Sequence, residues 1–116
     1  MGSIEKSRNL LREIGQNEEA LEKTSLQLKK LDNKFIEIES ILQRGKYLIH
    51  ETSEGWKGER ANRYLNQSFI NYSELRKQLQ SELHEHQERL IEQKSQLRKK
   101  GELLQKAYAE LKAKEQ

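Results

Sequence analysis

The sequence predicts an all-α fold, a long antiparallel two-helix hairpin that forms a coiled coil, and three observations carry this prediction. Apolar residues recur every seven positions through both halves of the 116-residue chain. The chain contains no proline, the residue that most strongly breaks a helix. A glycine-flanked stretch, Gly55-Trp56-Lys57-Gly58, lies near the middle, where a reversal would divide the chain into two arms of similar length.

The first predicted helix covers about residues 4–51 and shows the clearest repeat. Six apolar residues follow one another in steps of seven: Ile14, Leu21, Leu28, Phe35, Leu42 and Ile49. The companion row is Leu10, Asn17, Thr24, Leu31, Ile38 and Gly45. Rows at this spacing form the narrow buried seam of a coiled coil. The chain is only 33% apolar and 35% charged, a composition that also suits disorder, but disorder does not explain so regular a repeat.

The second predicted helix covers about residues 58–114. Its main row is Phe69, Arg76, Leu83, Leu90, Leu97, Leu104 and Leu111. The companion row is Leu65, Tyr72, Leu79, His86, Gln93, Lys100 and Ala107. Because this companion row turns polar after Leu79, we expect polar layers in the seam far from the reversal. Such layers weaken a coiled coil but specify its register or its partner.

A short elbow at about residues 52–58 joins the helices within one domain, residues 1–116, and so short a connection makes them antiparallel neighbours. The alternative is an unbroken rod in a parallel dimer, which Gly55 and Gly58 disfavour. We expect Thr52 or Ser53 to cap the second helix. A register centred on Lys57 pairs these residues: Leu42 with Tyr72, Gly45 with Phe69, Leu10 with Leu104, Phe35 with Leu79, and Ile49 with Leu65.

The elbow carries a motif, Trp56-Lys57-Gly58 followed by Ala61 and Tyr64. This arrangement resembles the WXG family of small helical proteins, which is associated with type VII (ESX-like) secretion in Gram-positive bacteria. In that family the Trp-x-Gly forms the loop between two antiparallel helices. Glycine gives such a loop its backbone freedom, and an aromatic ring can cover the open end of the helix pair.

One departure from the WXG pattern limits which members of that family this chain resembles. Secreted members carry a Tyr-x-x-x-Asp/Glu signal after the second helix, whereas here Tyr108 is followed by Lys112. The long polar arms are more similar to the small accessory proteins encoded beside LXG toxins. That resemblance implies a chaperone-like targeting protein that binds the toxin's N-terminal helical domain, or a sister WXG-like hairpin. The alternative is a structural coiled-coil adaptor of another system that forms homo-oligomers.

A two-helix hairpin cannot bury all the apolar residues of this chain, because several lie outside the two rows. They include Ile36, Ile41, Leu48, Ile70, Leu75, Ile91 and Leu103. We interpret them as a second seam for other helices. The residues expected to bind a partner cluster near the elbow: Ile41, Leu48, Ile70, Tyr72 and Leu75.

Other function classes find little support in the sequence. His84 and His86 point in different directions on a helix, so we expect no metal site. No nucleophile with a base, phosphate loop or dinucleotide motif is present, so we expect neither an enzyme nor a cofactor. The net charge of +3 is too small and dispersed to predict nucleic-acid binding. We expect no membrane span and a cytoplasmic location, with export alongside a cargo left open.

Overall fold

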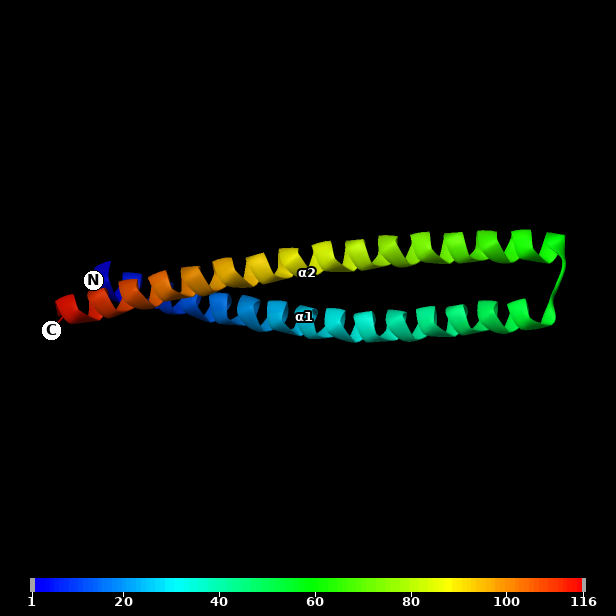
Figure 1. Ribbon diagram of the computed structural model, residues 1–116. Coiled ribbons are helices and arrows are strands. Elements are labelled where there is room, and N and C mark those ends of the chain that lie inside the picture. The colour runs from blue at the N-terminus through cyan, green and yellow to red at the C-terminus, as the bar shows by residue number, and fades with distance from the viewer. Residues whose placement is uncertain (1, 116) are drawn as a thin grey trace. The chain divides into compact units, whose positions relative to one another are not determined.

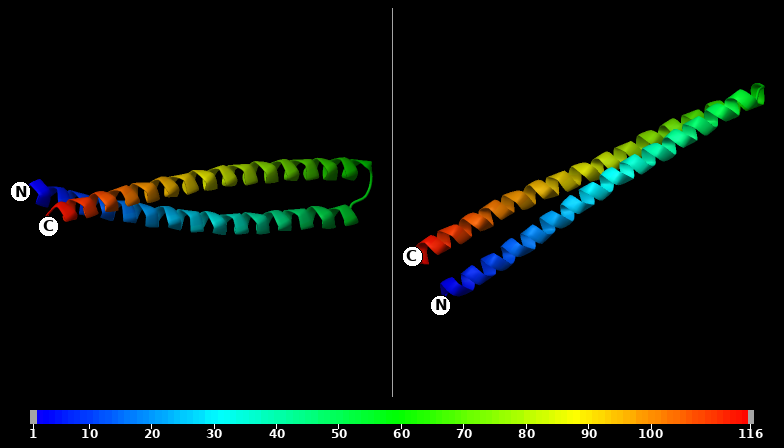
Figure 2. Two further views of the ribbon diagram at one scale, coloured as in Figure 1. Left: turned by 60° about the vertical axis from the view of Figure 1, so that its left-hand side comes forward. Right: turned by 90° about the horizontal axis from the view of Figure 1, so that it is seen from below.

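Two helices account for nearly all of the chain in the computed structural model, which describes residues 2–115. Helix α1 spans Gly2–Gly55 and helix α2 spans Glu59–Glu115, and residues 56–58 connect them. The helices run antiparallel (Figure 1), and the views of Figure 2 keep them side by side where they meet the connection. The predicted all-α antiparallel hairpin is therefore confirmed.

The elbow is shorter than predicted because α1 continues four residues beyond residue 51. The Thr52 and Ser53 hydroxyls donate hydrogen bonds to α1 carbonyls, those of Leu48 (2.8 Å) and His50 (2.6 Å), and do not cap the second helix. That expectation was wrong because these hydroxyls bond back to the preceding turn. Gly58 serves as the cap instead: its carbonyl accepts from the Asn62 N–H at 2.9 Å.

Gly58 also has a backbone conformation that other residues rarely adopt, with φ at +123°. A side chain at this position would strain the backbone by about 1–3 kcal/mol. The N–H of Trp56 closes the last turn of α1 by donating to the Thr52 carbonyl at 3.0 Å. The reversal is thus built from one closing hydrogen bond, one glycine and one opening hydrogen bond.

Packing divides the paired helices into two compact units. The elbow unit comprises residues 30–87 and contains the connection. The terminal unit combines residues 1–29 with residues 88–116. Each unit is an antiparallel pair of helical segments with its own seam.

The seam of α1 follows the predicted seven-residue repeat. All twelve predicted seam residues of α1 are buried or half-buried, with Thr24, Leu31 and Leu42 among the most buried. The repeat continues through both units without interruption. The two rows read from the sequence are therefore the rows that α1 turns toward α2.

The seam of α2 departs from the prediction in its companion row. The predicted members His86, Gln93, Lys100 and Ala107 are all exposed. In the main row, Phe69 is 38% exposed. The inward positions lie one residue later along the chain: Gln87, Lys94, Gly101 and Tyr108. The leucine row from Leu83 to Leu111 stays half-buried or buried, as predicted.

The shift follows from a change of period within α2. From Ala61 to Leu90 the inward positions are 61, 65, 68, 72, 76, 79, 83, 87 and 90, a spacing that repeats every eleven residues. Beyond Leu90 they follow the seven-residue repeat. An eleven-residue repeat has 3.67 residues per turn, close to the 3.6 of a straight helix. A count in steps of seven along the companion row is therefore one residue short of the inward position by the end of the elbow unit.

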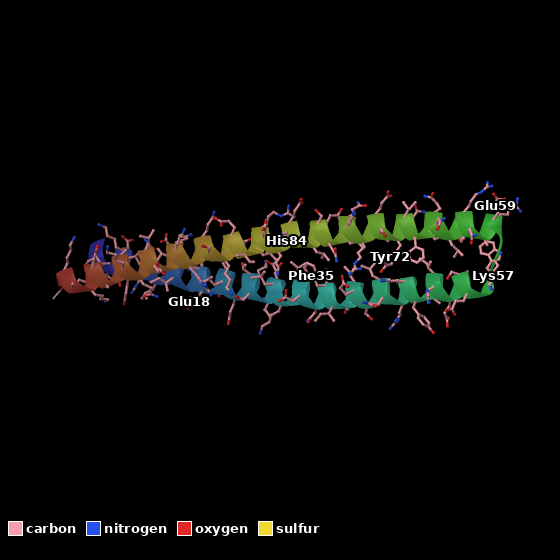
Figure 3. All side chains as sticks on the ribbon, viewed as in Figure 1. Glu18, Phe35, Lys57, Glu59, Tyr72 and His84 are labelled. Atoms are coloured by element: carbon pink, nitrogen blue, oxygen red, sulfur yellow. The ribbon has the colours of Figure 1, made fainter. Side chains whose placement is uncertain are left out.

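Tyr72 fixes the register of the elbow unit. Its hydroxyl donates to the Leu42 carbonyl at 2.6 Å, so the predicted contact between Leu42 and Tyr72 is present, through the backbone of Leu42. Figure 3 shows the Tyr72 side chain reaching from α2 toward α1. The same ring lies against Gly45, where a Cβ atom would stand 3.6 Å from ring atom Cε2. Gly45 therefore faces Tyr72, and the predicted pairing of Gly45 with Phe69 was wrong.

The terminal unit contains a buried polar layer around Asn17. The Asn17 side chain is only 5% exposed, and its Nδ2 donates to the Leu97 carbonyl at 3.0 Å. Its Oδ1 finds no hydrogen-bond donor within residues 2–115. A Cβ atom on Gly101 would stand 2.7 Å from Asn17 Nδ2, closer than atoms can approach without a shift. Gly101 thus provides the space that Asn17 occupies.

Thr24 forms the next polar layer of the terminal unit and is 1% exposed. Its hydroxyl donates to the Ala20 carbonyl at 2.9 Å and accepts a longer bond, 3.4 Å, from Gln93 Nε2. The Gln93 side chain therefore reaches the edge of the seam from an exposed backbone position. Polar layers in this half of the seam were predicted, and α1 contributes both of those described here.

Because Asn17 contacts Gly101, we expect the effect of Gly101→Ala on the free energy of unfolding to change sign when Asn17 is also replaced. An ordinary helix-interior Gly→Ala change stabilises a helix by about 1 kcal/mol. We expect Gly101→Ala to destabilise the protein, because the new methyl group displaces Asn17. In an Asn17→Ala background the same change is expected to stabilise it. Urea unfolding followed by circular dichroism measures both values.

Gly15→Ala is the matched control, because no other atom approaches within 4 Å of a Cβ at that position. It is expected to stabilise the protein in both backgrounds. Equal effects of Gly101→Ala with and without Asn17 would contradict a steric coupling of these residues.

Candidate interaction surface

The four residues of the elbow motif lie together at the reversal. The Trp56 and Tyr64 rings contact each other with centroids 5.5 Å apart and planes inclined at 58°. Ala61 is 1% exposed, and its small side chain lets neighbouring residues pack closely against the first turn of α2. Gly58 supplies the positive φ that brings α2 into this position. The motif therefore acts as a local unit in which the glycine sets the turn and the two rings pack on each other.

The aromatic pair covers the elbow only in part. Trp56 remains 42% exposed and Tyr64 remains 61% exposed. A tilted ring pair of this kind contributes about 0.5–1.5 kcal/mol beyond the area that it buries. The remaining exposed ring surface is large for a polar hairpin, so the elbow also presents aromatic area to solvent.

An apolar surface lies on one side of the elbow unit. We define the elbow face as the exposed side chains Ile41 and Leu48 of α1 and Tyr64 and Leu75 of α2, each 50–65% exposed. Ile41 and Leu48 are seven residues apart and share one flank of α1. Tyr64 and Leu75, eleven residues apart, share one flank of α2.

The Tyr72 register places these two flanks on the same side of the hairpin. The ion pair of Arg76 with Glu39 (3.5 Å) marks one side of the seam, and the flanks with Ile41 and Leu75 are on the other. Because the Tyr72 side chain reaches both Leu42 and Gly45, Ile41 lies within about one turn of Leu75, and Leu48 lies about one turn beyond Tyr64. The elbow face is therefore a patch contributed by both helices.

Two of the five predicted partner-binding residues lie elsewhere. Tyr72 sits in the seam, half-buried, with its hydroxyl bonded to α1. Ile70 is 51% exposed but projects from the side of α2 that faces away from α1. The helix register thus brings Ile41, Leu48 and Leu75 together and leaves Ile70 and Tyr72 outside the patch. Tyr64, predicted only as part of the elbow motif, belongs to the elbow face as well.

The opposite side of the elbow unit has a different character, which the sequence analysis missed. Lys46, Phe69 and Lys77 line hollows there, beside the Arg76–Glu39 ion pair. Gln80 Nε2 also donates to Glu39, at 3.1 Å. These residues come from two helices and meet only through the register, so no single segment of sequence signals them.

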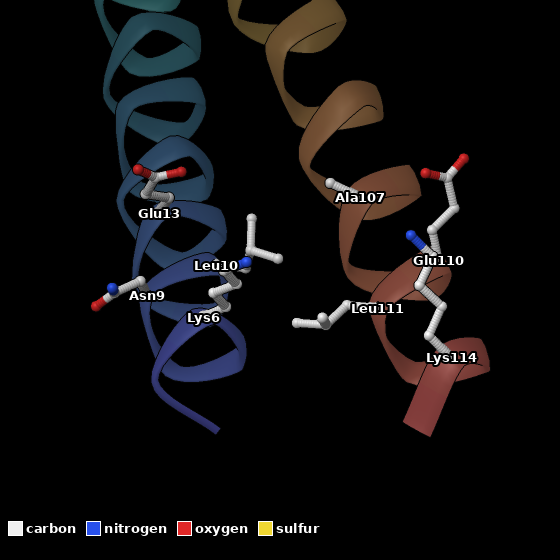
Figure 4. Close-up of a pocket in the computed structure, with 8 residues that line it drawn as sticks. All are labelled: Lys6, Asn9, Leu10, Glu13, Ala107, Glu110, Leu111 and Lys114. Atoms are coloured by element: carbon white, nitrogen blue, oxygen red, sulfur yellow. The ribbon is translucent and has the colours of Figure 1, made fainter. Parts of the chain in front are cut away.

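The terminal unit has its own shallow groove between the helices, with a volume of about 380 Å³. In Figure 4 the Leu10 and Leu111 side chains point toward the space between α1 and α2. Charged side chains of both signs border it, Lys6 and Glu13 on α1 and Glu110 and Lys114 on α2. The positive and negative charges at its border cancel, so the groove does not favour a ligand of either charge.

Electrostatic interactions on the surface are weak and local. The pairs His50–Glu54 and Arg63–Glu59 join residues four apart on exposed helix faces, a geometry that contributes only tenths of a kcal/mol. The pKa of Tyr47 is raised because its hydroxyl donates to Glu51 at 2.7 Å.

The side chain of Lys112, four residues after Tyr108, has two neighbours in the last turns of α2. Lys112 Nζ lies 5.6 Å above the centre of the Tyr108 ring and 3.5 Å from a Glu115 carboxylate oxygen. This end of α2 is helical through residue 115.

Within residues 2–115 no cluster of three or more potential ligands is arranged to hold a metal ion. No helix in that range is long and apolar enough to cross a membrane.

The elbow pair predicts a moderate loss of stability when the indole is removed. We expect Trp56→Ala to lower the free energy of unfolding by about 1–3 kcal/mol, less than truncation at a fully buried site because the ring is partly exposed. Tyr47→Ala, which removes an exposed ring elsewhere in the elbow unit, is expected to cost under about 1 kcal/mol. Native tryptophan emission should be blue-shifted relative to the unfolded protein. Identical native and unfolded emission would argue against ring packing at the elbow.

Comparison of the chain with protein-family models, with curated proteins and with solved structures gives no match. The geometry of the elbow and of the two sides of the elbow unit is therefore the basis for assigning a function.

Proposed function

We propose that this protein is a small helical accessory protein of type VII secretion that binds a helical protein partner. The partner is the N-terminal helical domain of an LXG-type toxin or a sister WXG-like hairpin. The observation that carries the proposal is the elbow face, because it exposes Ile41, Leu48, Tyr64 and Leu75 on one side of a two-helix hairpin. Exposed apolar patches with polar surroundings mark sites of protein association.

The elbow motif supports the link to type VII secretion. Trp56 and Gly58 occupy a three-residue loop between antiparallel helices, which is the arrangement that the resemblance to the WXG family implies. Ala61 and Tyr64 follow on the first turns of α2, as that resemblance also implies.

Helix-to-helix packing is the mode of binding that suits the elbow face. Ile41 and Leu48 on α1, with Leu75 of α2 within about one turn of Ile41, would pack against the apolar stripe of a third helix. Aromatic and large aliphatic anchors supply most of the free energy in such interfaces. The side chains are exposed in the hairpin, so the partner can reach them without unfolding it.

We expect charge substitution in the elbow face to abolish partner binding without loss of fold. The experiment co-expresses this protein with the N-terminal helical domain of an LXG-type toxin and measures co-purification. Ile41→Asp, Leu48→Asp and Leu75→Asp are each expected to prevent it, because a carboxylate buried without a partner costs several kcal/mol. Helicity by circular dichroism should remain near that of the wild type.

Ile36→Asp is the matched control, because Ile36 is 69% exposed on the back of α1 in the same unit. It and Lys112→Ala are expected to leave co-purification intact. Hydrogen exchange locates the interface: protection gained over residues 40–75 supports the proposal. Protection confined to residues 85–114 would move the interface to the terminal unit. Self-association that buries the elbow face would favour the homo-oligomeric adaptor. Sedimentation measures whether the protein self-associates.

A second expectation follows from Lys112. A reporter fused to the C-terminus of this chain is expected not to be secreted by the type VII system on its own, because a cation stands where the export acid belongs. Co-expression of the toxin should restore export if the partner carries the signal. Efficient secretion of the fusion in a strain without the toxin gene would contradict this expectation.

A further inference from the structure

A groove runs along the side of the elbow unit opposite the elbow face. It consists of two adjoining hollows between α1 and α2, with volumes of about 460 Å³ and 280 Å³. The hollows share Lys46 and Phe69 as lining residues, so they form one continuous surface. We call it the basic groove, and its defining residues are Lys46 and Tyr47 of α1 and Phe69, Tyr72, Arg76 and Lys77 of α2.

Aromatic rings provide the apolar part of the basic groove. Phe69, predicted in the seam, is 38% exposed and lines both hollows. The Tyr72 hydroxyl is bonded to the Leu42 carbonyl and the Tyr47 hydroxyl to Glu51. Because both phenol hydroxyls already have partners, these rings present mainly apolar surface. The groove is therefore suited to apolar side chains.

Cations provide the charged part, and they come from both helices. Lys46 lies on α1, and Arg76 and Lys77 lie on α2, while no carboxylate is among the lining residues. Arg76 is paired with Glu39 at 3.5 Å. Lys46 and Lys77 have no ion pair within residues 2–115. The two borders of the groove thus offer unpaired positive charge on either side of an aromatic floor.

We infer that the basic groove binds an amphipathic helix whose apolar stripe is flanked by acidic residues. Apolar side chains of that helix pack on Phe69, and flanking carboxylates reach Lys46 on one border and Lys77 on the other. This is the arrangement of a third coiled-coil helix, in which seam residues supply affinity and flanking charges select the partner. The inference stands apart from the secretion role, because it uses a different side of the hairpin.

A nucleic-acid strand suits the same groove less well. Glu51 and Glu54 lie on the α1 turns next to the groove, where they bond to Tyr47 and His50. Glu39 lies beside Arg76 on the same side. A phosphate backbone along the groove would pass these carboxylates, and nucleic-acid sites need a denser basic stripe than two unpaired lysines. A helix with separate carboxylates can place its charges at the lysines alone.

The test uses two synthetic peptides of about four heptads with leucine at the seam positions. One carries glutamate at the flanking positions and the other carries lysine, so that like charges keep each peptide from associating with itself. Fluorescence anisotropy of labelled peptide measures binding to the full-length protein at low salt. We expect the glutamate peptide to bind at least about tenfold more tightly than the lysine peptide.

Charge reversal then locates the site. Lys46→Glu alone is expected to weaken glutamate-peptide binding, and its combination with Lys77→Glu is expected to weaken that binding by about tenfold or more and to strengthen lysine-peptide binding. Lys34→Glu is the matched control for the single charge reversal, because Lys34 shares the flank of Ile41 on the other side of α1. It, and Ile41→Asp, should leave glutamate-peptide binding within about twofold of the wild type.

Three results would overturn the inference. They are equal affinity for the two peptides, equal loss of binding in the Lys34→Glu protein, and tighter binding of a labelled single-stranded RNA than of the glutamate peptide. Circular dichroism of each variant confirms that the exposed substitutions preserve the helices. Since Ile41→Asp is expected to remove toxin binding but not glutamate-peptide binding, failure of this inference and failure of the proposed function give different results.

Discussion

A pair of helices has only one seam, and this constraint governs the rest of the structure. Each helix can bury a single narrow stripe against the other, however many apolar residues it carries. Among residues 2–115 the buried apolar side chains are Leu31, Leu42, Ala61, Leu65 and Leu90. The large apolar residues outside the seam stay exposed, because residues 2–115 provide no third element to cover them. Packing between the two helices alone gives such a hairpin little stability. Any helix that packs along its flanks would stabilise it further.

The two units use their seams differently. In the elbow unit apolar and aromatic side chains supply most of the seam, with Arg76 and Gln87 half-buried beside them, and the Tyr72 hydroxyl bonds α2 to the backbone of α1. In the terminal unit buried Asn17 and Thr24 interrupt the apolar seam. Buried polar layers lower stability but favour one alignment of the helices, since any other alignment leaves their side chains unpaired. The elbow unit thus carries the surfaces suited to binding, and the terminal unit carries the side chains that select the alignment.

The sequence predicted the hairpin and the α1 seam well, because twelve positions of α1 obey one repeat and the elbow has two glycines near an aromatic residue. It predicted the α2 seam less well, since the change from an eleven- to a seven-residue period has no mark in residue type. Tyr72, and not Phe69, lies opposite Gly45. The spacing of apolar residues could not predict this, because the hydrogen bond from the Tyr72 hydroxyl to the Leu42 carbonyl holds the ring in place. The basic groove was missed for a related reason: Lys46 and Phe69 become neighbours only once the register is known.

The fit between Asn17 and Gly101 has a consequence for how such a chain can change over generations. A larger residue at 101 is tolerated only after Asn17 has been replaced by a smaller one, because a Cβ there would stand 2.7 Å from its amide. The order of substitution is therefore constrained, and descendants that have lost Gly101 should also have lost Asn17. This dependence between the two positions across an aligned set of relatives would record the helix alignment of the terminal unit without any structure.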